Sequence, residues 1–192
     1  LEKRTFTKED CQFGYRNSIF KNEVKGQYII TSVTFQLTRK DHQLKTGYGA
    51  ILNELKAKGI TKPTIKDISD VVIAIREQKL PNPKEIGNSG SFFKNPIISA
   101  SAFSALKEKF PEVPSYQISN EEVKVPAGWL IDQAGFKGYR DGDAGVHKNQ
   151  ALVLVNYGDA SGEEILALAK HIQQTIQEKF GIELEMEVNI IQ

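Results

Sequence analysis

The chain has 192 residues, of which 40% are hydrophobic and 26% charged, a composition typical of a globular protein with one domain or two small ones. Its 25 basic and 24 acidic residues leave a formal net charge of +1, which argues against a broad surface for nucleic acid or anionic lipid. The single cysteine, Cys11, excludes an internal disulfide, and no Cys/His set has zinc-ligand spacing. We therefore expect an inert thiol, no metal site and a reducing, cytoplasmic setting.

No apolar run approaches the roughly 20 residues that cross a bilayer, and no signal peptide opens the chain. We therefore expect neither secretion nor membrane insertion. The first residue is Leu rather than Met, and residues 3–8 already alternate like a strand edge. We expect the chain to begin inside a larger protein.

The first half of the chain predicts one strand and two helices. Hydrophobic residues alternate with more polar ones over residues 28–37, which predicts a strand with one better-buried face. Residues 50–58 predict a short helix closed by Gly59, and a second helix starts near residue 64 or 66 and stops before Pro81. Residues 80–83 read Leu-Pro-Asn-Pro, an extended stretch that we take as a domain boundary.

The second half alternates helices and strands. Helices are expected over residues 101–110 and 126–134, and an apolar strand over 151–157. A capping-box pattern at Ser161 then starts the clearest helix, which Gly181 ends. The last residues alternate strictly and predict a final strand. The sequence thus indicates an α+β protein, with a small domain from about residue 81 to 180 and flanking strands that belong to another part.

Residues 87–96, Gly-Asn-Ser-Gly-Ser-Phe-Phe-Lys-Asn-Pro, combine small residues, a hydroxyl, two aromatics, a cation and an amide. The glycines allow unusual dihedral angles, Phe92 and Phe93 can anchor the loop, and Ser91 can present a proton donor. Such a loop suits close approach to a ligand. A tight structural turn explains the same residues equally well.

Arg76 and Lys79 lie three residues apart on a predicted helix, and Lys94 can join them across the proline-rich connector. Three cations directed at one place would bind an anion such as a diphosphate. A basic last helical turn also arises simply because cations stabilise the helix dipole, which is the simpler explanation.

Other polar residues have ordinary explanations as well as functional ones. Arg16 lies in a turn, where it can bind a carboxylate or simply face solvent, and Glu187 on the last strand is by default a solvated carboxylate. We expect Trp129 to anchor the core. His147 has no carboxylate or second histidine at useful spacing, so we treat it as structural.

Several segments in one order resemble the UDP-N-acetylenolpyruvoylglucosamine reductases. They are Tyr15-Arg16-Asn17-Ser18, Arg76-x-x-Lys79-Leu80-Pro81, Gly90-Ser91-Phe92-Phe93-Lys94-Asn95-Pro96, Gly128-Trp129-Leu130-Ile131-Asp132-Gln133 and Val146-His147-x-x-Gln150-Ala151. The match runs nearly end to end, and the third segment is highly specific.

The resemblance implies an enzyme in which NADPH reduces a bound FAD and the flavin reduces UDP-N-acetylglucosamine enolpyruvate to UDP-N-acetylmuramate, a peptidoglycan precursor. It implies that Arg16 and Glu187 stabilise the developing enolate, and that Ser91 delivers the proton. It further implies a substrate-binding set: Tyr48, Arg76, Lys79, Lys94, Asn95, Tyr116 and Gln150. Tyr116 would lie near the uridine, and Tyr48 in a lid.

The resemblance also implies a domain plan. Residues 1–62 would be the remnant of a flavin-binding α+β domain to which residues 182–192 return, residues 63–80 a connecting helix, and residues 81–181 a smaller α/β substrate-binding domain. The glycine-rich segment that binds the FAD diphosphate in this family has no counterpart here, so we expect little flavin binding and little or no turnover.

Two alternatives remain open. The chain can be an inactive nucleotide-sugar binding module, or it can belong to a different FAD oxidoreductase that shares the flavin scaffold. We expect a monomer in either case.

Overall fold

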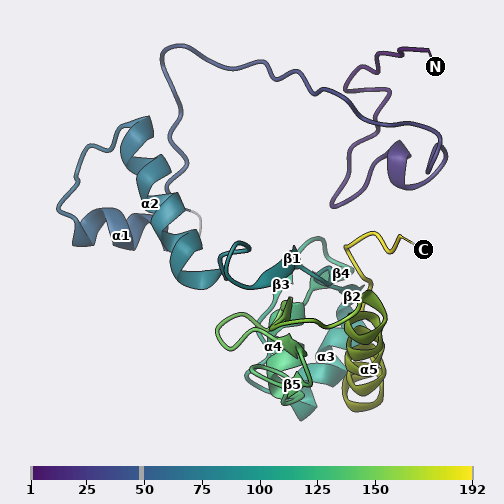
Figure 1. Ribbon diagram of the computed structural model, residues 1–192. Helices are drawn as coiled ribbons and strands as arrows, with labels where there is room; N and C mark the ends of the chain where they lie inside the picture. Colours follow the sequence, from purple (N-terminus) through teal and green to yellow (C-terminus); the bar gives the residue numbers. More distant parts are fainter. Residues whose placement is uncertain (1, 48–49, 192) are drawn as a thin grey trace. The chain divides into compact units, whose positions relative to one another are not determined.

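The computed structural model describes residues 2–47 and 50–191 (Figure 1). Contacts between residues separate two compact units, Leu1–Leu44 and Lys45–Gln192, which are described one at a time. No helix in the described ranges is both long enough and apolar enough to span a membrane. The assignment of residues 1–62, 63–80 and 81–181 to three functional parts stays a prediction.

The first unit consists of turns, extended chain and one short 3-10 helix, η1 (Ile19–Lys21). Cys11 and Ile19 are its buried apolar residues, and the Ile19 amide donates to the Cys11 carbonyl oxygen at 3.1 Å. A second small cluster joins the rings of Phe6, Phe20 and Tyr28, whose centroids lie 5.0 to 6.3 Å apart.

The strand predicted over residues 28–37 is wrong for this structure. These residues are extended but form no ladder, and their apolar side chains face solvent, with Ile29 86% and Leu37 81% exposed. A strand needs a neighbour for its N–H and C=O groups, and no other described segment pairs with this one. The alternating pattern of residues 28–37 therefore predicted their extended backbone correctly, but it carries no information about whether a neighbouring strand exists.

The second unit holds the remaining helices and all the strands of the described residues. The helices are α1 (Ile51–Ala57), α2 (Ile65–Lys79), α3 (Ala100–Lys109), α4 (Ala127–Gln133) and α5 (Gly162–Phe180). The strands are β1 (Gly87–Ser91), β2 (Ile97–Ser99), β3 (Tyr116–Gln117), β4 (Glu122–Lys124), β5 (Arg140–Asp141), β6 (Ala144–Val146) and β7 (Val153–Asn156). All predicted helices are present within a residue or two of their expected ends.

The caps explain where the longest helices begin and end. In α5, the Ser161 side chain accepts from the Glu164 amide while the Glu164 carboxylate accepts from the Ser161 amide. The helix ends at Gly181, which has the left-handed φ of 69° that suits glycine. The same reciprocal cap, between Thr64 and Asp67, starts α2. Both predicted starts are confirmed.

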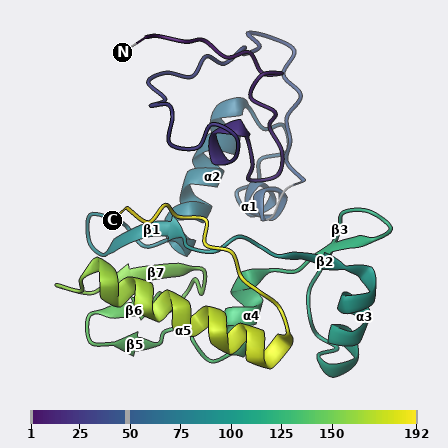
Figure 2. The ribbon, with the colours of Figure 1, turned by 90° about the vertical axis from the view of Figure 1, so that its right-hand side faces the viewer.

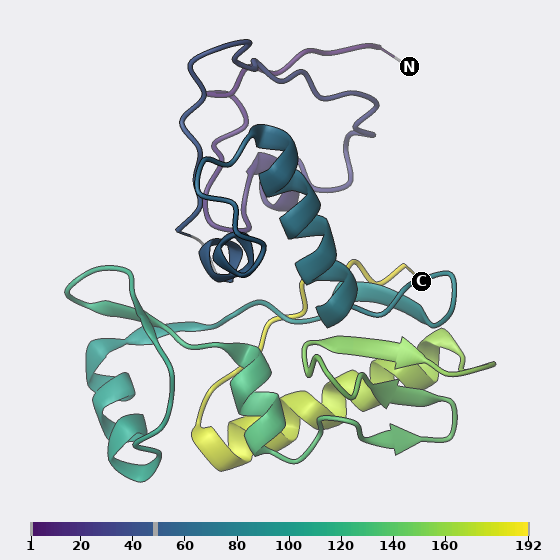
Figure 3. The same cartoon turned by 90° about the vertical axis from the view of Figure 1, so that its left-hand side faces the viewer.

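The strands form two antiparallel sheets, with the orders β1-β7-β6-β5 and β2-β4-β3. Helix α5 lies along one face of the four-stranded sheet, as Figures 2 and 3 show from opposite sides. The expected mixture of helix and sheet is confirmed. Because the described strand pairs are all antiparallel, the arrangement is α+β, and the α/β expectation for residues 81–181 is corrected to that extent.

The main core lies between the four-stranded sheet and helices α4 and α5. Its fully buried side chains include Val146, Leu130, Ile131 and Ile172. Trp129 is partly buried against this cluster, in ring contact with Phe110 and Phe180, as expected of a core anchor. Helices α1 and α2 pack through a separate small cluster of Ile51, Leu55 and Val71.

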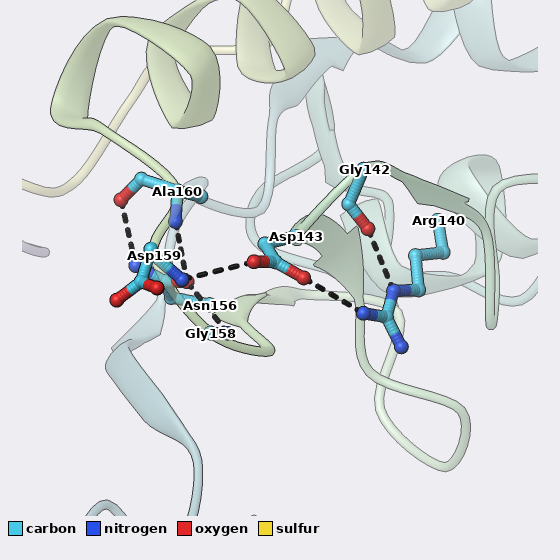
Figure 4. A network of polar contacts seen from close by, with 7 residues as sticks. All are labelled: Arg140, Gly142, Asp143, Asn156, Gly158, Asp159 and Ala160. Atoms are coloured by element: carbon cyan, nitrogen blue, oxygen red, sulfur yellow. Dashed lines mark hydrogen bonds and ion pairs between the residues drawn. The ribbon is translucent and has the colours of Figure 1, made fainter.

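A polar network joins the β5–β6 turn to the connection between β7 and α5 (Figure 4). The Asp143 carboxylate accepts from the Asp159 amide at 3.0 Å and from the Arg140 guanidinium at 2.8 Å. The Asp159 amide, and then Arg140, lower the pKa of Asp143 below its usual value. A Cβ at Gly158 would lie 2.5 Å from an Asp143 oxygen, so a larger residue there would displace the Asp143 carboxylate from this network.

Candidate functional site

The site is organised by residues 91–95, which follow a distortion in β1. Asn88 pairs with Val155, but Ser91 pairs with Val153, so β1 has one extra residue between these two pairs. Gly90 takes up that residue with a left-handed φ of 75°. Such a bulge re-aims the side chains that follow it. It leaves Ser91 exposed at the end of β1, directly before two buried phenylalanines.

Phe92 and Phe93 fix this segment to the core. They are 4% and 1% exposed, and the Phe92 amide donates to the carbonyl oxygen of Leu152 at 2.8 Å. The anchoring role predicted from the sequence is therefore confirmed, and the segment is more than a solvent-exposed turn. The exposed or half-buried polar residues Ser91, Lys94 and Asn95 flank the two rings.

The closing segment of the chain pairs with the same residues. Phe93 and Met186 form an antiparallel bridge, the Glu187 amide donates to the Phe92 carbonyl oxygen at 2.8 Å, and the Lys94 amide donates to that of Glu185 at 2.9 Å. Glu187 thus lies opposite Phe92 and next to Ser91 in the ladder. Only this bridge forms, so the long final strand that the sequence predicts is wrong beyond it.

The burial of the closing segment still follows the predicted alternation at first. Ile182 and Leu184 are buried, and Glu183 and Glu185 are exposed. The burial of Ile182 and Leu184 on one face, and not pairing in a sheet, stabilises the start of this segment. The first residues of this segment pack into the main core of the second unit. The return of residues 182–192 to a flavin domain stays a prediction.

Asn95 and Gln150 both lie against the first turn of α4. The Asn95 side-chain oxygen accepts from the Ala127 amide at 2.9 Å. A Cβ on Gly128 would lie 3.7 Å from the Gln150 side-chain oxygen, so Gln150 lies against the same turn. Two amide side chains predicted to bind substrate thus border the same helical turn, and one of them directly follows Lys94 in the chain.

Lys94 is the best-buried cation of the predicted set. Its side chain is only 19% exposed, and its ammonium pairs with the carboxylate of Glu185 across the ladder. The sequence analysis did not single out Glu185. Glu185 could have been noticed in the sequence, because it shares a face of the alternating segment with Glu187. The register that brings it to Lys94, however, depends on tertiary pairing.

Tyr116 lies in the three-stranded sheet and is 60% exposed. Its strand partner is Lys124, whose ammonium lies 5.4 Å from the centroid of the Tyr116 ring. An exposed aromatic ring beside a cation can stack on a base. Lys124 is a second charged residue that the sequence analysis passed over.

Arg76 and Lys79 lie in the last turn of α2, as predicted, and both are exposed. Within residues 2–47 and 50–191, neither side chain forms a hydrogen bond or ion pair. The cluster with Lys94 that we expected is therefore not formed by direct contacts in this structure.

Arg16 lies in the first unit, in a turn closed by hydrogen bonds of 3.0 and 3.3 Å between Gly14 and Asn17. Its φ of 53° is unusual for a residue with a side chain, so the turn holds Arg16 under strain. Because it belongs to a separate unit, its grouping with Ser91 and Glu187 stays a prediction. Tyr48 falls outside the described residues.

His147 is buried beside β7, and burial lowers its pKa below the ordinary value of 6.5. Its Nδ1 lies 3.4 Å from the Asn149 amide, which stabilises the turn before β7. This agrees with the structural role that we expected. Within the described ranges, no three His, Cys, Asp or Glu side chains gather as they would around a metal ion.

A flavin does not fit the described residues of the first unit. It presents no sheet and no α-helix whose N–H groups could receive a diphosphate, and its alternating apolar row has no partner. The second unit instead offers a hydroxyl, an ammonium, two amides and a carboxylate around residues 91–95. Such a set can bind an anionic, oxygen-rich ligand and provide a proton donor.

Comparisons with known proteins identify the family. A protein named UDP-N-acetylenolpyruvoylglucosamine reductase from Flavobacterium johnsoniae is 63% identical over 99% of this chain and 56% of its own length. A relative of the same name from Chromobacterium violaceum is 53% identical over 99% of this chain and 55% of its own length. The chain thus spans about half the length of these relatives.

A crystal structure of UDP-N-acetylenolpyruvylglucosamine reductase from Thermus caldophilus aligns with 27% identity and a TM-score of 0.40, over 65% of this chain and 33% of that one. The family model described as "UDP-N-acetylenolpyruvoylglucosamine reductase, C-terminal domain" matches residues 82–191, which is more than half of the chain. The chain therefore belongs to the UDP-N-acetylenolpyruvoylglucosamine reductase family, through its C-terminal domain.

Proposed function

We propose that this chain is the substrate-binding part of a reductase that converts UDP-N-acetylglucosamine enolpyruvate to UDP-N-acetylmuramate for peptidoglycan synthesis. The supporting observation is the pairing of residues 92–94, which include Lys94 and follow directly after Ser91, with residues 185–187, which include Glu187. The family membership supports the same substrate class. The proposed setting is the cytoplasm, with the protein acting as a monomer.

The substrate carries a diphosphate and a carboxylate, and the site has suitable groups for both. Lys94 is a cation with three donor hydrogens, and the Asn95 and Gln150 side chains add amide N–H groups. Arg76, Lys79 and Tyr48 complete the proposed diphosphate site, and Tyr116 the uridine site. The flat exposed ring of Tyr116, with Lys124 beside it, suits a nucleobase.

The proposed catalytic residues are Ser91, Glu187 and Arg16. Reduction of the enol ether adds a proton to the carbon that bears the ether oxygen, and the Ser91 hydroxyl is the proposed donor. A serine hydroxyl is a weak acid, so the transfer depends on the basicity of the enolate and on nearby cations such as Lys94. Glu187 and Arg16 are proposed to stabilise the enolate as it forms.

In the family, FAD supplies the hydride and NADPH reduces the flavin. The described residues of the first unit do not fit the flavin, so in our proposal the dependence on FAD and NADPH belongs to a longer polypeptide. By itself, the chain would bind the nucleotide sugar but turn over little or nothing. Purified chain should accordingly lack the visible absorbance of a flavin.

The central test is Ser91→Ala in a full-length protein that carries this chain. Removing the proton donor should slow reoxidation of the reduced flavin by substrate by about 10²- to 10⁴-fold, the usual contribution of a general acid. The affinity for the substrate should change little, because the hydroxyl makes only a small part of the contacts. Reoxidation as fast as in the unmodified protein would contradict the assignment.

A second candidate function is a nucleotide-sugar binding module with no catalytic role. It is favoured by the separation of the chain into two units and by a first unit that has no sheet or α-helix in its described residues. A thermal-shift titration of the chain with UDP-N-acetylglucosamine enolpyruvate tests binding. If a full-length protein binds the substrate fully but does not reduce it, the chain is a binding module and not part of a reductase.

A further inference from the structure

Glu185 holds the side chain of Lys94 in two ways. The backbone amide of Lys94 donates to the Glu185 carbonyl oxygen at 2.9 Å, and the Lys94 ammonium pairs with the Glu185 carboxylate. The two residues lie directly opposite each other across the short ladder, the arrangement in which cross-strand side chains interact most strongly. The position and the direction of the Lys94 side chain are therefore both set by the closing segment.

The two partners differ in exposure. The Lys94 side chain is 19% exposed, whereas the Glu185 side chain is 69% exposed. The Lys94 side chain is thus largely covered, whereas the carboxylate that pairs with its ammonium is mostly exposed to solvent. An ammonium has three donor hydrogens, and the carboxylate needs only one, so two remain for a ligand.

We propose that Glu185 is a positioning residue, which orients the Lys94 ammonium toward the anionic part of the substrate. This inference rests on the proposed function, because it takes Lys94 as a ligand-binding group. Glu185 itself does not touch the substrate. It acts by restricting the rotamers of Lys94 before the ligand arrives.

The opposite role, in which Glu185 competes with the anion for Lys94, must be weighed against this one. A carboxylate about 6 Å from a bound anion, in a largely aqueous setting, weakens binding by about threefold, and salt reduces this further. Releasing a lysine side chain to all its rotamers costs up to roughly tenfold or more in affinity. The orienting effect is therefore the larger one, because the exposed carboxylate is well screened.

The two effects can be separated with two substitutions at the same position. Glu185→Gln keeps an oxygen that accepts from the ammonium but removes the charge, so binding should stay equal or become up to about threefold tighter. Glu185→Ala removes both, so binding should become about threefold weaker. Glu183→Ala is the matched control, since Glu183 is exposed on the same face and has no ion pair in the described part of the chain.

Isothermal titration of the chain and its variants with UDP-N-acetylglucosamine enolpyruvate measures these affinities. We expect Glu185→Ala to bind about three- to tenfold more weakly than Glu185→Gln, with Glu183→Ala unchanged. In a full-length enzyme the same ratio should appear in KM while kcat stays constant, which a general loss of structure would not produce.

The outcomes distinguish this inference from the proposed function. If Glu185→Ala binds as tightly as Glu185→Gln while Lys94→Ala weakens binding, the positioning role is refuted and the substrate site stands. If the unmodified chain does not bind the nucleotide sugar, or if Lys94→Ala binds it normally, the proposed site itself fails and the role of Glu185 falls with it.

Discussion

Replacing Phe93 with alanine tests whether the candidate site is built on the core of the second unit. Phe93 is 1% exposed, its ring centroid lies 5.4 Å from that of Phe92, and its backbone faces Met186 across the closing bridge. The ring therefore joins the segment that carries Ser91 to the segment that carries Glu187. Replacing the Phe93 ring with a methyl group should leave a cavity beneath the segment that carries Ser91 and the segment that carries Glu187.

The expected cost follows from the burial. Deleting a fully buried phenylalanine ring destabilises a protein by about 3 to 5 kcal/mol, because apolar transfer energy is lost and the cavity closes only in part. A typical domain has a total stability of about 5 to 15 kcal/mol. The Phe93→Ala variant should thus be folded at low temperature but markedly easier to unfold.

Urea unfolding followed by the fluorescence of Trp129 provides the assay. Trp129 is the only tryptophan of the chain and packs against the same core, so its signal reports on that part alone. The midpoint should fall while the slope stays constant. Ile118→Ala is the control, because Ile118 is 48% exposed and its loss should cost less than about 0.5 kcal/mol. If the urea midpoints of Phe93→Ala and Ile118→Ala fell by the same amount, the candidate site would not be built on this core.

Three further predictions concern the framework of the second unit. Ser161→Ala removes the cap of α5 and should cost about 1 kcal/mol in thermal unfolding, whereas Ser161→Asp, which can still cap, should cost much less. Gly145→Ala would place a Cβ 2.7 Å from the Tyr157 ring and 2.9 Å from a backbone oxygen, and should lower the free energy of unfolding measured in urea by about 1 to 3 kcal/mol. His147 has a lowered pKa, so the unfolded chain binds its proton first: stability should be complete above about pH 6.5 and fall as the pH drops through the folded pKa. In denaturant titrations at a series of pH values, His147→Gln should lack this part of the pH dependence; an unchanged profile would assign the effect to another group.

Local signals in the sequence were sufficient to predict the helices. The start of α5 at Ser161 and its end at Gly181 depend on hydrogen bonds and dihedral angles within a few residues. The anchoring of residues 91–95 by Phe92 and Phe93 was also predictable, since two adjacent aromatic residues in a polar loop are most stable when buried. The anchoring of this segment was therefore predictable before the structure, whereas its binding of a ligand stays a proposal.

Alternation of apolar residues was less informative about strands. Residues 28–37 and the closing segment have the same pattern, yet the first is exposed and unpaired among the described residues, whereas the second is half-buried and forms one bridge. A strand is stabilised by partners that are distant in the sequence, and its own pattern does not say whether they exist.

The amino-acid sequence by itself determined the family, the helices and their caps, and the identity of the polar groups at residues 91–95. The tertiary structure alone decided that the closing segment pairs with this loop and that Glu185 faces Lys94. It also decided that the Asn95 and Gln150 side chains both lie against α4. The physical reason is distance along the chain. Caps and turns are formed by neighbouring residues, but the register between residues 92–94 and 185–187 depends on how a shared core buries Phe93, Leu184 and Met186 together.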